Sequence, residues 1–302
     1  MQTIDFLGIG APRAGTTWLW NILFHHPNIW MPPRKELHYF DRSPKYPSPS
    51  YLAGDSFARR MFGFQPPNAQ FRKKLFRSLA KILLLRSNWR EIKWNVRYLL
   101  RTIDDSWYLS LFEDAGYNIV KGEITPAYCL LDVADVQHVR ELLPDLKIIY
   151  LLRNPVDRAW SDLRFDWTMG KFKKMNQPEA LRAAAERLGS APRGQYLRTI
   201  HTWKTFFSDK NIFIGFYDDI LARPEEFSKE IFKFLSVDYA AKLPDKLLTA
   251  RINAARDIQM PDYIARLLSE SYLPQVKILC EMFPGGYPEK WLAELRENLD
   301  QN

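Results

Sequence analysis

Residues 6–20 read FLGIGAPRAGTTWLW, and this stretch decides the fold. The apolar run Phe6–Ile9 enters a turn with a glycine at each end, and a helical pattern begins at about Thr16 and stops before Pro27. Glycine permits the tight turn, the exposed amides of such a loop face an anion, and the helix N-terminus adds its dipole. We therefore predict a strand, a phosphate-binding loop and a helix, in that order.

The position of the positive charge separates this loop from the P-loop of nucleotide kinases. Thr16 stands where that motif has lysine, and the basic residue is Arg13, two positions before the second glycine. A strand, a turn with two glycines and a helix also occur together without any phosphate. The strand context, the paired threonines and Arg13 together favour an anion as the ligand.

Three further apolar runs repeat the pattern of a buried strand followed by a turn and a helix. They cover residues 118–120, 147–152 and 212–216. Such units predict a parallel sheet between helices, so the expected fold is a three-layer α/β/α, P-loop-like domain. We expect one domain over residues 1–302, with a helical insertion at 42–105 and a helical C-terminal third. Breaks in the C-terminal helices are expected at Pro244, Pro261, Pro274 and Pro284.

A second candidate anion site follows the run at 147–152. In a P-loop NTPase this strand would end in an aspartate that holds Mg²⁺, but here it ends in Arg153. A guanidinium repels a metal ion and grips two phosphate oxygens at once, whereas the competing interpretation is a surface ion pair with Asp157. The Asn-Pro pair that follows predicts a helix start, and Ser161, two turns later, could reach the same anion.

Most of the positive charge lies in one segment. The net charge is +8, but residues 59–101 contain twelve basic residues and one acidic residue, so the rest of the chain sums to −3. Apolar side chains in this segment follow a helical stripe. It is predicted to be a lid helix with a solvated basic face, or a surface for an anionic membrane, an acidic carrier protein or a polyanionic acceptor.

Composition favours a cytoplasmic globular protein. There is no run of 18 apolar residues and no signal-peptide pattern, which argues against a membrane span or export. Cys129 and Cys280 are too few for a disulfide framework or a cysteine metal site. We expect no metal and no nucleic-acid partner, with possible membrane contact limited to the basic segment 59–101.

The two anion sites together call for a ligand with separate anionic groups, and the motifs resemble the sulfotransferases that use 3′-phosphoadenosine 5′-phosphosulfate (PAPS). Residues 12–19, PRAGTTWL, resemble the 5′-phosphosulfate loop of that family, and residues 152–161 resemble its 3′-phosphate strand and helix. Residues 34–41, RKELHYFD, and residues 122–128, GEITPAY, resemble segments of the heparan-sulfate branch. Residues 193–207 are similar to the Gly-x-Tyr…Trp…Phe helix of that branch, and the order of the motifs agrees with the family.

The resemblance implies that PAPS is the donor and adenosine 3′,5′-bisphosphate the product. Trp18 is a candidate to pack on the adenine, although a tryptophan that opens a buried helix is as often part of the core. The expected contacts to the 5′-phosphosulfate are Arg13, Ala14, Gly15, Thr16 and Thr17. The expected contacts to the 3′-phosphate are Arg153, Ser161 and Arg256.

Transfer also needs a base that removes the proton of the acceptor hydroxyl. Glu36 matches the glutamate that the heparan-sulfate branch uses, and His38 is the second candidate because its ordinary pKa is near neutrality. Without the resemblance, Glu36 would be interpreted as an ion-pair partner on a solvated loop. Arg13 is expected to neutralise the departing phosphate. The residues expected on the acceptor side are Lys35, Glu123 and Tyr128.

One departure bears on the acceptor. Ile124 replaces a lysine that the heparan-sulfate enzymes use near their acceptor, and the sequence shows no Golgi membrane anchor. We therefore expect a soluble bacterial member that acts on a hydroxyl of a carbohydrate, a lipid or a carrier-bound small molecule. Two rival functions stay open: a P-loop nucleotide kinase, which would need Mg²⁺, and a nucleotide- or membrane-binding module without a catalytic base.

Overall fold

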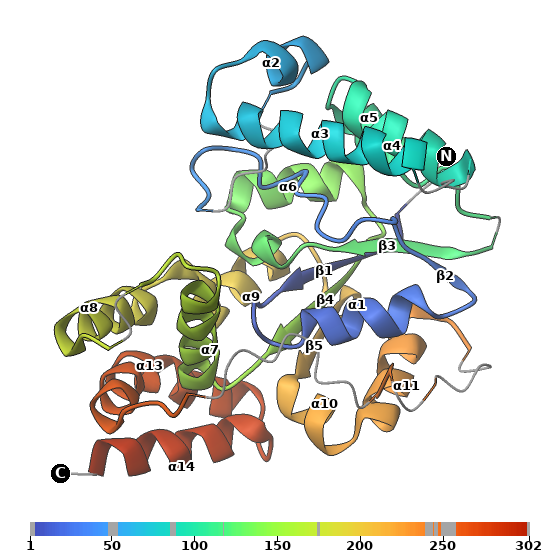
Figure 1. The fold of residues 1–302 in the computed structure, drawn as a ribbon. Helices are drawn as coiled ribbons and strands as arrows, with labels where there is room; N and C mark the ends of the chain where they lie inside the picture. Colours follow the sequence, from blue (N-terminus) through green and yellow to red (C-terminus); the bar gives the residue numbers. More distant parts are fainter. Residues whose placement is uncertain are drawn as a thin grey trace.

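The centre of the protein is a five-stranded parallel sheet with the order β2–β3–β1–β4–β5, as the computed structural model shows (Figure 1). The predicted parallel α/β fold is confirmed. The structure describes residues 4–47, 54–84, 89–116, 118–173, 176–238, 244, 247–248 and 258–300. The strands are β1 (Phe6–Gly10), β2 (Ile29–Trp30), β3 (Val120–Ile124), β4 (Lys147–Leu152) and β5 (Ile212–Phe216).

Helices cover both faces of the sheet and make the three layers. The core is continuous from one layer to the next because every residue of β1 and all but the first residue of β4 are buried. One face carries α1 (Thr16–Phe24), α10 (Tyr217–Ala222) and α11 (Pro224–Leu235) (Figure 1). The other face carries α6 (Val133–Leu142) and α9 (Tyr196–Lys204) (Figure 1).

Two helical groups extend beyond the sheet. The first is the insertion, which lies between β2 and β3 in the sequence and forms helices at one end of the molecule (Figure 1). It consists of α2 (Phe57–Phe62), α3 (Pro66–Leu84), α4 (Trp89–Leu100) and α5 (Asp105–Ser110). The second group contains α7 (Pro155–Thr168), α8 (Pro178–Gly189), α13 (Asp262–Met282) and α14 (Tyr287–Asp300). Short 3₁₀ turns lie at Pro126–Leu130, Pro192–Gly194 and Asp209–Asn211.

Helix α7 begins as its sequence predicts. The side chain of Asn154 accepts a hydrogen bond from the amide of Val156 at 3.0 Å, and Pro155 takes the first helical position. An N-cap of this kind satisfies an amide that has no partner inside the helix. This start fixes the direction in which α7 leaves the end of β4, and therefore the position of Ser161.

Three details differ from the prediction. The second predicted strand, 118–120, lies at Val120–Ile124, and the two-residue β2 was not expected because so short a strand has no periodicity to detect. Pro274 does not break the chain but lies inside α13. Pro274 and Glu270 are on the exposed side of α13, where water can satisfy the carbonyl that loses its partner.

No helix in the described part of the chain combines the length and the apolar character needed to cross a bilayer.

Candidate active site

The candidate site is built where the strands of the sheet end. The loop after β1, the segment after β2, Thr125 after β3 and Arg153 after β4 all follow the carboxyl ends of parallel strands. In open parallel sheets this edge is where ligands bind. The sheet therefore brings together residues that lie as far apart in the sequence as Arg13 and Arg153.

The loop between β1 and α1, residues 10–17, has the backbone that an anion site needs, and we call it the phosphate loop. Gly15 has φ of +88°, a conformation that favours glycine, and a Cβ atom there would lie 2.4 Å from Cδ1 of Ile220, so the isoleucine side chain would have to move. The N-cap residue of α1 is Gly15, which has no side chain to cap the helix. The dipole at this end of α1 favours an anionic ligand.

Arg13 and Ser161 meet although 148 positions separate them. The Nε atom of Arg13 donates to Oγ of Ser161 at 3.2 Å, and the guanidinium lies 4.5 Å from the ring centre of Phe165. Burial lowers the pKa of Arg13, while the charge of Asp162 opposes that shift. Arginine stays a cation under such shifts, so the contact joins the two predicted anion sites around a fixed positive charge.

Arg153 closes the same site from the end of β4. Its Nη1 atom donates to the carbonyl of Arg13 at 3.2 Å, and its guanidinium lies 4.6 Å from the ring centre of Tyr217. The competing ion pair with Asp157 exists, but it spans 3.9 Å and Asp157 is 53% exposed. Such a pair contributes little to stability. Among the residues that the structure describes, the buried Nε atom of Arg153 has no hydrogen-bond partner.

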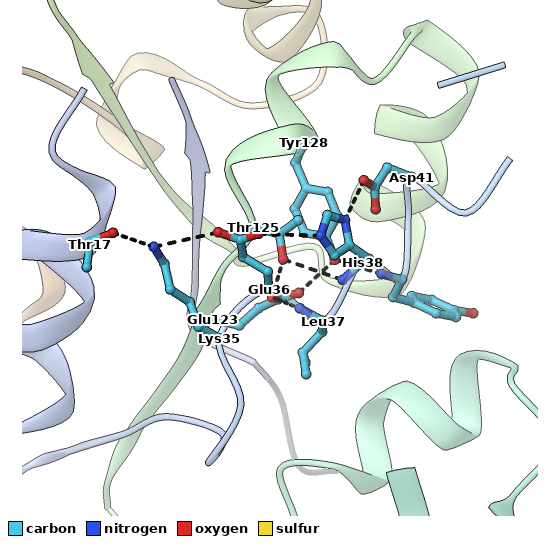
Figure 2. Close-up of polar contacts among 10 residues, drawn as sticks. Thr17, Lys35, Glu36, Leu37, His38, Asp41, Glu123, Thr125 and Tyr128 are labelled. Carbon is cyan, nitrogen blue, oxygen red and sulfur yellow. Dashed lines mark hydrogen bonds and ion pairs between the residues drawn. The ribbon is translucent and has the colours of Figure 1, made fainter. Parts of the chain in front are cut away.

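The segment 34–41 brings the candidate bases beside the phosphate loop (Figure 2). Nζ of Lys35 donates to Oγ1 of Thr17 at 2.9 Å and lies 3.6 Å from a carboxylate oxygen of Glu36. The other oxygen of Glu36 lies 3.5 Å from Nε2 of His38. Nδ1 of His38 in turn contacts Oδ2 of Asp41 at 2.7 Å. One chain of polar contacts thus runs from the phosphate loop to a fully buried aspartate.

Electrostatics give Glu36 and His38 opposite charges. Burial would lower the pKa of His38, but its contacts with Asp41 and Glu36 outweigh burial and raise that pKa to about 10. Burial would raise the pKa of Glu36, but His38 and Lys35 hold it below its ordinary value. At neutral pH the histidine is therefore a cation and the glutamate an anion.

The backbone of this segment is strained, and hydrogen bonds to buried side chains hold it in place. Glu36 and His38 have φ of +63° and +55°, in the left-handed region that costs about 1–2 kcal/mol for residues other than glycine. The carboxylate of Glu123 accepts from the amide of Leu37 at 3.2 Å, and the hydroxyl of Tyr128 accepts from the amide of Tyr39 at 3.0 Å (Figure 2). These bonds hold Glu36 toward the phosphate loop.

Glu123 and Tyr128, predicted on the acceptor side, lie inside the protein. They are 1% and 0% exposed, and the hydroxyl of Tyr128 donates to Glu123 at 2.8 Å. Thr125 and Tyr108 also donate to the Glu123 carboxylate, at 2.7 and 3.1 Å. Both oxygens of Glu123 therefore accept hydrogen bonds inside the protein, and the pair holds the backbone of the 34–41 segment.

Two other predicted contacts have different outcomes. Trp18 is 4% exposed, its ring stacks on Phe227 at 5.8 Å between centres, and its Nε1 donates to the carbonyl of Leu248 at 3.0 Å. The alternative that this tryptophan belongs to the core is the one that the structure favours, because the indole is already enclosed. Arg256 lies outside the described residues.

Sequence reasoning missed three side chains of the site. Asp41 lies at the end of the quoted RKELHYFD motif, and its spacing of three from His38 could have suggested a pair. Phe165 follows Ser161 by four positions on the same helix face. Tyr217 follows the end of β5, and nothing in the local sequence marks it as a partner of Arg153.

Comparisons with known proteins agree with this architecture. A family model described as a sulfotransferase domain matches residues 134–262. A sulfotransferase from Alicyclobacillus acidocaldarius has 21% identity and a TM-score of 0.65, over 96% of this chain and 99% of its own. A search of curated proteins gave no match.

Two more distant structures also match. The sulfotransferase domain of the Synechococcus PCC 7002 olefin synthase has 17% identity and a TM-score of 0.49, over 99% of this chain and 95% of its own. A mouse sulfotransferase complexed with PAP has 16% identity and a TM-score of 0.45, over 97% and 89%. Residues 134–262 therefore match the sulfotransferase domain model, and the chain shares its fold with the sulfotransferase from Alicyclobacillus acidocaldarius, in agreement with the predicted family.

Proposed function

We propose that this protein transfers a sulfuryl group from PAPS to the hydroxyl of an acceptor, with Glu36 as the base. The observation that carries the proposal is the contact of Lys35 with both Thr17 and Glu36, at 2.9 and 3.6 Å. It couples the phosphate loop to a carboxylate that is 40% exposed and ionised at neutral pH. A donor group and a base must meet in this way for transfer between two bound molecules.

The roles of the residues follow from their charges. Glu36 takes the proton of the acceptor hydroxyl as the acceptor oxygen bonds to sulfur, and the bond from sulfur to the 5′-phosphate oxygen breaks. Arg13 and the amides of the phosphate loop hold the charge that develops on that leaving oxygen. His38 already carries a proton and therefore orients Glu36 rather than acting as the base.

The two anion sites fit a donor with two phosphate groups. The phosphate loop would hold the 5′-phosphosulfate, while Arg153 and Ser161 would hold the 3′-phosphate. The 3.2 Å contact between Arg13 and Ser161 supports this division, because it sets the two sites side by side. A nucleoside triphosphate needs no separate 3′ site, so this pairing favours PAPS over the kinase alternative.

The donor is tested by ligand binding without any acceptor. We expect adenosine 3′,5′-bisphosphate to stabilise the protein against thermal unfolding whether or not Mg²⁺ is present, by about 2.7 kcal/mol at 100 times its Kd. ATP should do much less. Stabilisation by ATP only when Mg²⁺ is added would instead establish the kinase alternative.

The assignment of Arg153 is tested by the same measurement. Arg153→Ala removes charge-assisted hydrogen bonds, so the bisphosphate should bind about 10–100-fold more weakly. Arg266→Ala, at an exposed arginine on α13, is the matched control and should bind as the unmodified protein does. Equal binding by both variants would remove Arg153 from the 3′ site.

A further inference from the structure

We infer that the outer surface of the insertion docks on an anionic lipid bilayer. This surface consists of the exposed aromatic and basic side chains of α2, α3, α4 and the α2–α3 turn. The inference goes beyond the proposed sulfuryl transfer, and it does not depend on which donor the protein uses.

The insertion exposes an unusual amount of apolar surface. Seven of the thirteen large apolar side chains exposed in the described part of the chain lie between Phe62 and Leu100. Phe64 is 99% exposed, while Phe62 and Trp89 are each 73% exposed. Scattered single apolar residues are normal on a soluble protein, but such a concentration marks an interaction surface. The others in the segment are Phe76, Leu79, Val96 and Leu100.

Hydrogen bonds hold the two most exposed phenylalanines away from the core. Nη1 of Arg72 donates to the carbonyls of Met61 and Gly63, at 3.0 and 2.9 Å. Nδ2 of Asn68 donates to the carbonyls of Arg59 and Arg60, at 2.9 and 3.2 Å. The α2–α3 turn is therefore fixed by its backbone, so Phe62 and Phe64 project outward as a property of the fold.

Each of the two longer helices presents a mixed outer face. On α3, Phe71 and Leu75 are buried, which leaves Phe76 and the basic residues beside it on the outside. On α4, the buried side is that of Trp94 and Tyr98. Figure 1 shows α2, α3 and α4 together in one helical layer at the end of the molecule opposite α14. The three helices thus lie at the same end of the protein.

The positive charge on this surface favours an anionic bilayer as the partner. Basic residues alternate with the aromatic ones, and the only acidic residue between positions 59 and 101 is Glu91. Aromatic rings favour the interface between lipid headgroups and acyl chains, and basic residues are attracted to anionic headgroups. A basic helix with aromatic residues lies in the plane of such an interface. The exposed basic residues are Arg59, Lys73, Arg77, Arg90, Lys93 and Arg101.

The inner side of the same helices reaches the candidate site. The guanidinium of Arg34 lies 4.5 Å from the ring centre of Tyr98 on α4, and Arg34 begins the segment that carries Glu36. On α3, burial and the nearby charge of Arg34 lower the pKa of Lys74 to about 7. One helical layer therefore separates the docking surface from the base. Given the proposed function, this arrangement suits an acceptor that is itself held in the bilayer.

Vesicle binding tests the inference without donor or acceptor. The full chain should sediment with vesicles of phosphatidylglycerol and phosphatidylcholine in equal amounts, and much less with pure phosphatidylcholine. Lys73→Ala, Arg77→Ala and Lys93→Ala together should weaken binding about a hundredfold, since each basic residue near an anionic surface contributes about fivefold. Phe62→Ser, Phe64→Ser and Trp89→Ser together should weaken it at least tenfold, with unchanged thermal unfolding.

Matched variants elsewhere provide the controls. Val133→Ser, Met169→Ser and Leu221→Ser change side chains that are 53–58% exposed and lie outside the insertion. Lys171→Ala, Lys173→Ala and Lys210→Ala remove three exposed charges elsewhere. Both control proteins should bind the vesicles as the unmodified chain does, and all variants should still bind adenosine 3′,5′-bisphosphate if the proposed function is correct.

Three results would overturn the inference. The protein could stay in solution with phosphatidylglycerol vesicles, bind pure phosphatidylcholine equally well, or lose binding equally in the control variants. If it ignores vesicles but binds an acidic carrier protein through Phe64 and Lys73, the surface belongs to a protein partner instead. None of these results affects the donor test, so failure of the docking surface and failure of the proposed function are distinguishable.

Discussion

The phosphate loop and the segment 34–41 both follow strand ends of the same sheet, but they are held in different ways. The phosphate loop has a glycine at each end and leads directly into α1; it holds one residue other than glycine in the left-handed region, Arg13 with φ of +70°, whose carbonyl accepts a hydrogen bond from Arg153. The segment 34–41 has two residues other than glycine in left-handed conformations, and its backbone is held by Glu123 and Tyr128 from another part of the chain.

The two regions therefore differ in which groups they present to the site and in what holds those groups in place. The phosphate loop presents backbone groups together with the side chain of Arg13, which contacts Ser161. The segment 34–41 presents Glu36, a side chain whose charge and position depend on Lys35, His38 and, through His38, on Asp41. Strain of this type persists only when the surrounding structure holds it, and it is typical of functional sites.

The largest effect is expected at Glu36. Glu36→Gln keeps the shape of the side chain but removes the base, so kcat should fall about 10²–10⁴-fold. Binding of adenosine 3′,5′-bisphosphate, measured by calorimetry, should stay within about twofold because the phosphate loop is intact. A variant with normal turnover would show that the two regions do not share the chemistry as proposed.

Glu123→Gln tests whether the network beneath the segment 34–41 positions Glu36. Replacing one carboxylate oxygen by an amide NH₂ sets a donor against the donors that now reach Glu123, at about 1–3 kcal/mol for each unsatisfied group. We expect a fall in kcat of at least tenfold with little change in the Kd of the bisphosphate. Glu141→Gln, at an exposed position on α6, is the control. A parallel loss of donor affinity would argue for general unfolding rather than positioning.

Gly15→Ala tests the phosphate loop in the opposite way. The added methyl group would lie 2.4 Å from Ile220 and would also force a residue other than glycine to φ of +88°, so the variant should lose about 2–4 kcal/mol of unfolding free energy. Bisphosphate binding should also weaken. Gly170→Ala has a similar φ of +70° but no atom within 4 Å, so it isolates the conformational cost at about 1–2 kcal/mol. Equal losses in denaturant titrations of both variants would exclude a steric role for Gly15.

The pH dependence of kcat distinguishes Glu36 from His38 as the base. With Glu36 ionised and His38 protonated, kcat should be flat through neutrality, because the pKa of Glu36 lies below 4.5 and that of His38 is about 10. It should fall as the pH rises through 10 and His38 loses its proton. An increase in kcat centred near pH 6.5 would instead identify a neutral histidine as the base.

The same shift predicts that the stability of the protein depends on pH. Since folding raises the pKa of His38 from 6.5 to about 10, its ion-pair contribution is complete below pH 6.5 and is lost as the pH rises toward 10. His38→Asn should therefore flatten the dependence of unfolding free energy on pH across that range. Denaturant titrations at pH 6, 8 and 10 measure it, and parallel curves for both proteins would refute the assigned charge.

Much of the donor side could be predicted because local rules fix it. The glycines and threonines of the phosphate loop, the strand that ends in Arg153 and the Asn-Pro start of α7 are short-range signals, and the fold that they predict is confirmed. Prediction failed where packing outweighs local preference. Pro274 is tolerated on an exposed helix side. The two alternatives for Trp18 could not be decided from the sequence, because the ring it stacks on, Phe227, belongs to a distant helix.

By itself, the sequence determined the parallel α/β fold, and it predicted the phosphate loop and two candidate bases, Glu36 and His38. Only the tertiary structure decided three other features. Glu123 and Tyr128 hold the backbone beside Glu36 from within the core, Asp41 raises the pKa of His38, and Arg13 contacts Ser161. The reason is physical: turns and helix starts depend on neighbouring residues, whereas the charge and exposure of a side chain depend on whatever the fold packs against it.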